Sequence, residues 1–201
     1  ICARTIELKI TTRTRAIQVM HYGGSPCEMD PIMELARRHD LFVIEDCAHA
    51  PGAVYNGKKC GTIGDIGIFS FFSNKNMSTG EGGMVTTNDE ELAAKIRLMR
   101  SHGMTSLTLD RHRGHCFTYD VVEAGHNFRI DEIRSAIGIV QLDKLPGNNA
   151  KRGAIDEMYR RELRVVPQLS VPFEIRYGGS AYHIFPVVLA RGIDRGRFME
   201  Y

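Results

Sequence analysis

The sequence predicts an α/β fold built around a mostly parallel sheet. Residues 16–22 and 41–46 are short apolar runs of strand length, and the segment between them has apolar residues at helical spacing. The second run is continuously apolar until its acidic end, which is typical of a strand covered by helices on both faces. The order strand, helix, strand therefore favours parallel pairing with helices packed against the sheet.

The other elements of the first half can be placed from turn and capping signals. The Asn56-Gly57 pair predicts a hairpin turn, and Asn88 or Asp89 can cap a helix. The expected hairpin, two strands and helix lie at residues 55–58, 66–72, 83–87 and 88–102. Residues 103–126 show little apolar periodicity, and we interpret them as a long functional or mobile loop.

The second half is predicted to contain two helices and a strand. Apolar residues recur at helical spacing after Asp131, and Pro146-Gly147 is expected to end that helix because proline removes a backbone donor. A second helix and a strand are expected at residues 148–164 and 181–189.

These elements suggest two domains. Residues 1–146 form a large domain shortened at its N-terminus, and residues 147–201 form a connecting helix and the start of a small C-terminal domain. The chain begins at Ile1 and stops at Tyr201 just after a predicted helix start, so both ends look cut.

The composition excludes several classes of partner. The 201 residues are 43% hydrophobic, enough for a sizeable core. There are 26 basic and 24 acidic residues, so a net charge of +2 gives no electrostatic argument for nucleic acid or an acidic membrane surface. Five scattered cysteines, with no signal peptide or long apolar stretch, favour a reducing cytoplasm.

One amine and one carboxylate carry the strongest chemical signal. Lys75 follows the predicted strand at residues 66–72 in a segment rich in Ser and Asn, and Asp46 ends the strand at residues 41–46. This pairing suits pyridoxal phosphate (PLP), whose aldehyde binds an amine and whose pyridine nitrogen is held protonated by an acid. The non-functional interpretations are a solvent-exposed loop lysine and an aspartate that only ends a strand.

Several segments occur in an order and spacing typical of one enzyme family: Ile44–Ala50, Gly64–Phe72, Lys75-Asn76, Gly80–Val85, Gly125–Ile130 and Gln141–Leu145. In these segments, and over nearly its whole length, the chain resembles the DegT/DnrJ/StrS-type sugar aminotransferases. The resemblance implies an aspartate aminotransferase-like (type I PLP) large domain with a mostly parallel sheet, plus part of a small α/β C-terminal domain. The family's phosphate-gripping loop and ring-stacking aromatic would lie upstream of Ile1, so we expect the fragment alone to bind PLP weakly or not at all.

The resemblance assigns roles to four residues around the cofactor. It implies that Lys75 is the Schiff-base lysine and shuttles a proton, and that Asp46 contacts the pyridine nitrogen. His49 would hydrogen-bond the ring's 3-oxygen or lie against its face, and Ser70 would contact the phosphate. A structural histidine and an ordinary strand-end serine are the alternatives for the last two.

The resemblance also implies contacts with substrate and with a second subunit. Asn127 matches an asparagine that reaches the phosphate bound in the neighbouring subunit, which implies a homodimer with shared active sites. Arg129 would bind the nucleotide diphosphate of a sugar or a donor carboxylate, with a surface salt bridge nearly as well supported. His183 resembles a position near the substrate.

Two other patterns are weaker than they look. The Gly80–Gly83 turn lacks the Lys-Ser/Thr ending of a phosphate-binding loop and leads into a strand, so we interpret it as a tight turn. His112, His115 and Cys116 have no second pair at ligand spacing, and a solvated loop is favoured over a zinc site. No metal is expected.

The leading hypothesis is an aminotransferase that moves an amino group from glutamate or a similar donor to a ketone on a nucleotide-linked sugar. A pyridoxamine-phosphate-dependent sugar dehydratase is the enzymatic alternative, but there the lysine is typically replaced by histidine, whereas Lys75 is present. A catalytically inactive or regulatory remnant of the same fold is the alternative from another class. Neither nucleic acid nor a membrane is expected as a partner.

Overall fold

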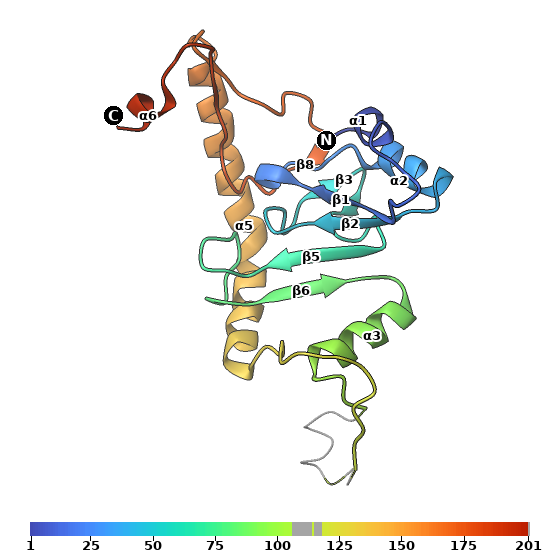
Figure 1. Ribbon diagram of the computed structural model, residues 1–201. Helices are drawn as coiled ribbons and strands as arrows, with labels where there is room; N and C mark the ends of the chain where they lie inside the picture. The colour runs from blue at the N-terminus through green and yellow to red at the C-terminus, as the bar shows by residue number, and fades with distance from the viewer. Residues whose placement is uncertain (106–113, 115–117, 201) are drawn as a thin grey trace.

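A four-stranded sheet forms the centre of the molecule (Figure 1). The computed structural model describes residues 1–105, 114 and 118–200. The strands lie in the order β1-β2-β5-β6. Their bounds are Ala16–Met20, Phe42–Asp46, Ile66–Ser70 and Gly83–Thr86. The first three strands are parallel and β6 is antiparallel to β5, which confirms the mostly parallel sheet.

Among the described residues, helices cover one face of this sheet. Ile17, Val19 and Val43 are buried with the apolar side of helix α2 (Met29–Arg38), and the short helix α1 (Ala3–Glu7) packs beside them. On the other face Phe42 is 57% exposed and Ile68 40% exposed. The expectation that helices cover both faces is therefore wrong for this chain, because alternate residues of each strand point to a side that none of its described helices covers.

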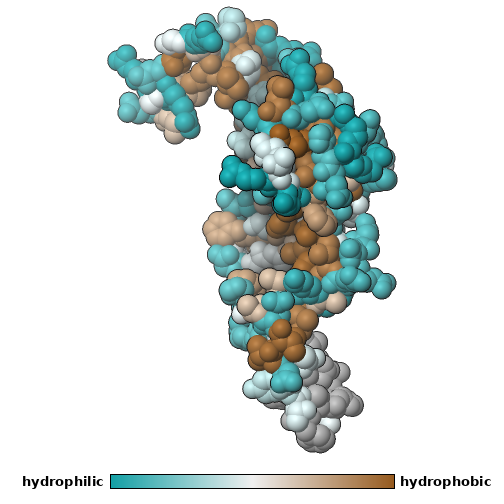
Figure 2. Space-filling view, turned by 45° about the vertical axis from the view of Figure 1, so that its right-hand side comes forward, coloured by the Kyte–Doolittle hydropathy of each residue, from teal (hydrophilic) through white to brown (hydrophobic). Residues whose placement is uncertain are grey.

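Exposed apolar residues also occur outside the open sheet face. Figure 2 shows apolar side chains gathered over the middle of the molecule and again toward its lower end. Residues Met84 and Val85 of β6 are each about half exposed, as are several apolar residues farther along the chain. These exposed apolar residues recur at the spacing of one face of a strand or helix, which is typical of a surface that is buried against another one.

The predicted hairpin is confirmed. Strands β3 (Val54–Tyr55) and β4 (Lys58–Lys59) pair antiparallel, and both turn residues, Asn56 and Gly57, have positive φ. Strand β8 (Gly178–Gly179) adds to the other edge of β3. A distant C-terminal segment is thereby attached to the body of the fold.

Helix α3 (Glu90–Arg100) also begins as expected. The Asp89 side chain accepts hydrogen bonds from the backbone N–H groups of Glu91 and Leu92, which caps the first turn. The predicted loop that follows lies partly outside the described residues.

The prediction that Pro146-Gly147 ends a helix is wrong. Helix α5 runs without interruption from Glu132 to Leu163, with Pro146 inside it. It lies across the end of the sheet where β2 and β5 terminate (Figure 1). Its buried residues Leu145, Asn149, Gly153 and Asp156 form a stripe at helical spacing. Packing and hydrogen bonds along this stripe offset the roughly 3 kcal/mol that an interior proline costs.

The C-terminal segment is mostly irregular. A strand was predicted over residues 181–189, but only β9 (Val188–Leu189) forms, paired with β7 (Leu169–Ser170). The preceding residues instead bond to a short 3-10 helix, η1 (Tyr22–Gly24), and to α5. The chain then leaves the body of the fold and ends in the short helix α6 (Arg195–Met199), as Figure 1 shows. None of the described helices has both the length and the apolar character of a membrane span.

Candidate active site

Asp46 and Ser70 lie at the carboxyl ends of neighbouring parallel strands. Asp46 pairs in register with Ile68, and Ser70 follows two residues later on the same face of the sheet. The Asp46 Oδ1 atom accepts a hydrogen bond from the Ala48 N–H at 3.0 Å. Its second carboxylate oxygen has no hydrogen-bond partner among the described residues. The carboxyl edge of an open parallel sheet is where ligands bind in such folds.

Lys75 lies in the turn that follows β5. Its backbone N–H donates to the Phe72 carbonyl at 3.0 Å, which folds the chain back after the strand. The side chain is partly buried, and within the described part of the chain its amine forms neither a hydrogen bond nor an ion pair. Its positive charge contributes to lowering the pKa of both His49 and His183, so the amine lies near the two imidazoles.

His49 follows Asp46 in the turn after β2 and is affected by the charges of both Asp46 and Lys75. Its Nδ1 atom accepts a hydrogen bond from the Gly23 N–H at 3.4 Å. Burial lowers the pKa of His49, the positive charge of Lys75 lowers it further, and Asp46 opposes both. The structure therefore brings Asp46, His49 and Lys75 into one electrostatic environment.

His183 is far from these residues in sequence but joins the same site. Its ring centroid lies 4.3 Å from that of His49, with 34° between the planes. Its backbone N–H donates to the Gly23 carbonyl at 2.8 Å, so Gly23 contacts both histidines. The neighbouring Gly24 is needed for this approach, because a Cβ atom there would lie 2.7 Å from the Tyr182 nitrogen.

Two asparagines that the sequence analysis did not single out as site residues hold these segments together. Asn76 is 5% exposed and contacts Asn149, the Ala181 carbonyl and His183. Asn149 in turn donates to the Pro51 carbonyl at 2.9 Å. The only signal for Asn76 was its place directly after Lys75, and nothing marked Asn149 in a segment expected to begin a new helix.

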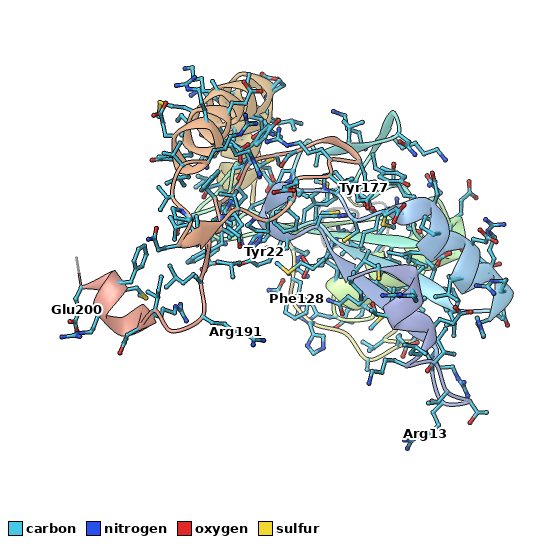
Figure 3. All side chains as sticks on the ribbon, turned by 90° about the horizontal axis from the view of Figure 1, so that it is seen from above. Arg13, Tyr22, Phe128, Tyr177, Arg191 and Glu200 are labelled. Carbon is cyan, nitrogen blue, oxygen red and sulfur yellow. The ribbon has the colours of Figure 1, made fainter. Side chains whose placement is uncertain are left out.

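Other groups line the same region. Arg152 of α5 donates from Nη1 to the His183 carbonyl at 3.2 Å. The Tyr22 ring, labelled in Figure 3, lies 5.8 Å from His49 and 6.3 Å from Phe173. Tyr22 is 45% exposed, so its ring offers an accessible aromatic surface beside the histidines.

Asn127 and Arg129 are not joined to this cluster. Both are exposed and lie in the described segment 118–131 that leads into α5. Asn127 pairs through its backbone with Ser101 at the end of α3. Among the described residues, no hydrogen bond or ion pair links either side chain to Lys75, and their roles stay predictions.

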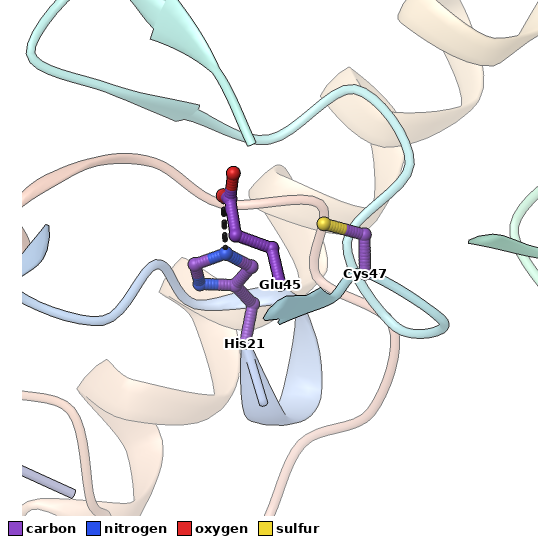
Figure 4. A group of neighbouring side chains, drawn as sticks. All are labelled: His21, Glu45 and Cys47. Atoms are coloured by element: carbon purple, nitrogen blue, oxygen red, sulfur yellow. Dashed lines mark hydrogen bonds and ion pairs between the residues drawn. The ribbon is translucent and has the colours of Figure 1, made fainter. Parts of the chain in front are cut away.

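A second cluster, His21, Glu45 and Cys47, has the composition of a metal site but another role (Figure 4). Its potential ligand atoms lie within 4.8 Å of one another. However, His21 Nε2 donates to Glu45 Oε2 at 3.0 Å, and His21 Nδ1 accepts from the Cys27 N–H at 3.0 Å. With both ring nitrogens engaged, this histidine has no free atom for a metal ion.

Both carboxylate oxygens of Glu45 are likewise engaged in hydrogen bonds. Its two oxygens also accept hydrogen bonds from the backbone N–H groups of Gly61, Ile63 and Gly64 at 2.7–2.8 Å. Burial alone would raise the pKa of Glu45, but these donors and His21 lower it. The cluster therefore anchors the loop before β5 to the ends of β1 and β2. The weaker candidate ligands His112, His115 and Cys116 lie outside the described residues.

Comparison with known proteins gives matches over nearly the whole chain. The sequence profile of the DegT/DnrJ/EryC1/StrS aminotransferase family matches residues 1–201. The GDP-perosamine synthase of Caulobacter vibrioides is 43% identical over 196 residues, which are 97% of this chain and 50% of that protein. The chain thus spans about half the length of this curated relative.

Solved structures agree. The Helicobacter pylori aminotransferase PseC, involved in the biosynthesis of pseudoaminic acid, is 34% identical with a TM-score of 0.87, over 95% of this chain and 50% of that one. The E. coli GDP-4-keto-6-deoxy-D-mannose-3-dehydratase with bound hydrated PLP is 29% identical with a TM-score of 0.87, over all of this chain and 54% of that one.

Proposed function

The chain belongs to the DegT/DnrJ/EryC1/StrS aminotransferase family, and on that premise we propose that the protein moves an amino group from an amino-acid donor to a keto group of a nucleotide-linked sugar. The observation that carries this proposal is the convergence of Lys75, Asp46 and His49 at the carboxyl edge of the parallel sheet. The fold itself is that of the type I PLP enzymes that the solved relatives represent.

The residues of the site fit PLP. Asp46 has a carboxylate oxygen without a hydrogen-bond partner, and Lys75 has a partly buried amine without one, within the described part of the chain. An acid and an amine are the two groups that a pyridine nitrogen and an aldehyde require. PLP, when bound, supplies an electron sink that makes the proton on the substrate carbon acidic.

Each residue then has a defined task. Lys75 binds the cofactor aldehyde through Nζ and later holds and returns the proton at the substrate carbon. Asp46 keeps the pyridine nitrogen protonated with its free oxygen. His49 orients the ring from the adjacent turn, and Ser70 binds the phosphate from the end of β5. The family resemblance and the shared sheet edge support these roles.

The substrates are inferred from the relatives. The Caulobacter relative is a synthase of GDP-perosamine, an amino sugar, which favours a nucleotide sugar as acceptor. Glutamate is the donor we propose. His183 would contact the sugar, and the exposed Arg129 would bind its diphosphate or the donor carboxylate.

The assembly is also part of the proposal. We infer a homodimer in the cytoplasm, in which Asn127 of one subunit reaches the phosphate bound by the other. Its exposure, and the lack of any link to Lys75 among the described residues, support a role outside its own site. Residues 1–146 would form the cofactor-binding domain, with α5 continuing into the smaller domain that residues 147–201 begin.

A sugar dehydratase is the second candidate, because one structural relative has that activity. The amine of Lys75 favours transamination, since it can hold the cofactor between turnovers. An inactive remnant is the remaining alternative. The presence of Lys75 beside Asp46 and His49 favours transamination over both alternatives.

The test is the absorbance spectrum of the full-length protein loaded with PLP, because this chain alone is expected to bind the cofactor weakly or not at all. We expect a visible band from bound cofactor, loss of that band on adding glutamate, and its return on adding a keto sugar nucleotide. Lys75→Ala should lack the band, whereas the exposed control Lys95→Ala should keep it. A Lys75→Ala protein with the same band as the parent would refute the assignment.

A further inference from the structure

The hydrogen bonds of two buried amides fix their own orientation. The Asn149 Nδ2 group donates to the Pro51 carbonyl at 2.9 Å, so its Oδ1 atom must face Asn76. Asn76 uses its Nδ2 group to donate to that oxygen at 2.8 Å and to the Ala181 carbonyl at 2.6 Å. Because backbone carbonyls can only accept, neither amide can be turned over without losing these bonds.

This orientation determines the protonation of His183. The Asn76 Oδ1 atom can only accept, and it lies 2.8 Å from His183 Nδ1. Nδ1 must therefore carry the proton and donate it to Asn76. In the neutral ring the other nitrogen, Nε2, is then left with a lone pair on the edge of the ring away from Asn76.

The surroundings keep Nε2 unprotonated. Burial is the largest cause that lowers the pKa of His183, to about 4, and His49, Lys75 and Arg152 add to it. All three neighbours are basic groups, so a second positive charge is unfavourable. A base this weak does not carry a proton at neutral pH, but it accepts hydrogen bonds.

The neutral His49 ring is the opposite tautomer. Its Nδ1 atom accepts the Gly23 N–H, so the proton of the neutral ring is on Nε2. The two rings, whose centroids lie 4.3 Å apart, therefore differ at Nε2, which is a donor in His49 and an acceptor in His183. The backbone of Gly23 holds both, since its carbonyl accepts the His183 N–H.

We propose that Asn76 is a positioning residue that fixes His183 as the Nδ1–H tautomer, and that the bare Nε2 accepts a hydrogen bond from a hydroxyl or amine of the sugar substrate. The second part rests on the function proposed above. A site built to accept such a bond discriminates strongly against a sugar that lacks the donor, because the acceptor is then left unpaired.

The tautomer is tested by NMR on protein labelled with ¹⁵N-histidine, without cofactor or substrate, with His183→Asn used to assign the signal. We expect His183 to carry its proton on Nδ1 from pH 6 to 8. Asn76→Ala should give a mixture of tautomers, and Asn149→Ala, which leaves the Asn76–His183 bond in place, should not. A proton on Nε2 in the parent protein would overturn the proposal, even if Asn76→Ala does not fold.

Kinetics of two substitutions at His183 test the acceptor. His183→Gln places an amide near the position of Nε2, whereas His183→Asn places one near Nδ1 only. We expect kcat/KM for the sugar to fall about tenfold in His183→Asn and less in His183→Gln, with smaller changes for the amino donor. Equal losses for both variants would contradict the acceptor role. If Lys75 binds PLP but His183 carries its proton on Nε2, this inference fails and the proposed function stands. If the tautomer is as expected but Lys75 does not bind PLP, the proposed function and the acceptor role fail, and the positioning role of Asn76 stands.

Discussion

His183 Nδ1 lies 2.8 Å from Asn76 Oδ1, so the C-terminal segment is bonded to the residue directly after Lys75. This bond lies in a buried amide network that also includes α5 and the turn after β2. The segments that carry His183 and Lys75 are thus bonded to each other as well as to the elements beside them. A substitution that shifts one of these segments should therefore shift the other.

Acid should weaken the fold through His183. Its pKa is about 4 in the folded chain and about 6.5 in an unfolded one, so the unfolded chain binds more protons between these values. The contribution is fully present above pH 6.5 and is lost as the pH falls toward 4. Urea unfolding at several pH values should show a shallower decline in His183→Asn than in the parent. The exposed control His39→Asn should keep the parent slope, and an unchanged slope in His183→Asn would count against the burial of this ring.

Glu45 should be essential for stability although it takes no part in the chemistry. In Glu45→Gln the amide would direct N–H groups at backbone donors, so we expect a loss of about 2–4 kcal/mol in the free energy of unfolding. Chemical denaturation measures this change in the free energy of unfolding. Glu34→Gln, at an exposed site on α2, should cost less than about 0.5 kcal/mol. Similar small losses for both would show that the cluster is not the anchor described above.

Two glycines of α5 should respond oppositely to alanine. A Cβ atom at Gly147 meets nothing within 4 Å, so Gly147→Ala should stabilise the protein by about 0.5–1 kcal/mol. At Gly153 the Cβ atom would lie 3.0 Å from the Tyr182 ring, so Gly153→Ala should destabilise it. Thermal unfolding of the two variants checks this. A melting temperature lowered by Gly147→Ala would argue against a continuous helix through Pro146.

Local patterns were sufficient for the sheet and for part of the site. The apolar run before Asp46 and the Asn56-Gly57 turn gave their elements correctly, because strand alternation and turn chemistry are local. The strand-end position of Asp46 followed directly. The assignment of Lys75 as the cofactor lysine came from the family resemblance and stays a prediction.

Long-range packing explains the failures. Pro146 is a helix breaker by propensity, yet the buried stripe of α5 keeps the helix whole. The role of Asn76 depends on Ala181 and His183, which no local pattern connects to it. Asn127 and Arg129 were assigned from the resemblance alone, and their positions neither join nor exclude them from a site shared between subunits.

The most direct measurement of the central claim is reduction of the full-length, PLP-loaded protein with borohydride, followed by peptide mass mapping. A single pyridoxyl label on the peptide that contains Lys75, absent from Lys75→Arg, is the result we expect. A label on another lysine, or no label while cofactor is demonstrably bound, would contradict the account.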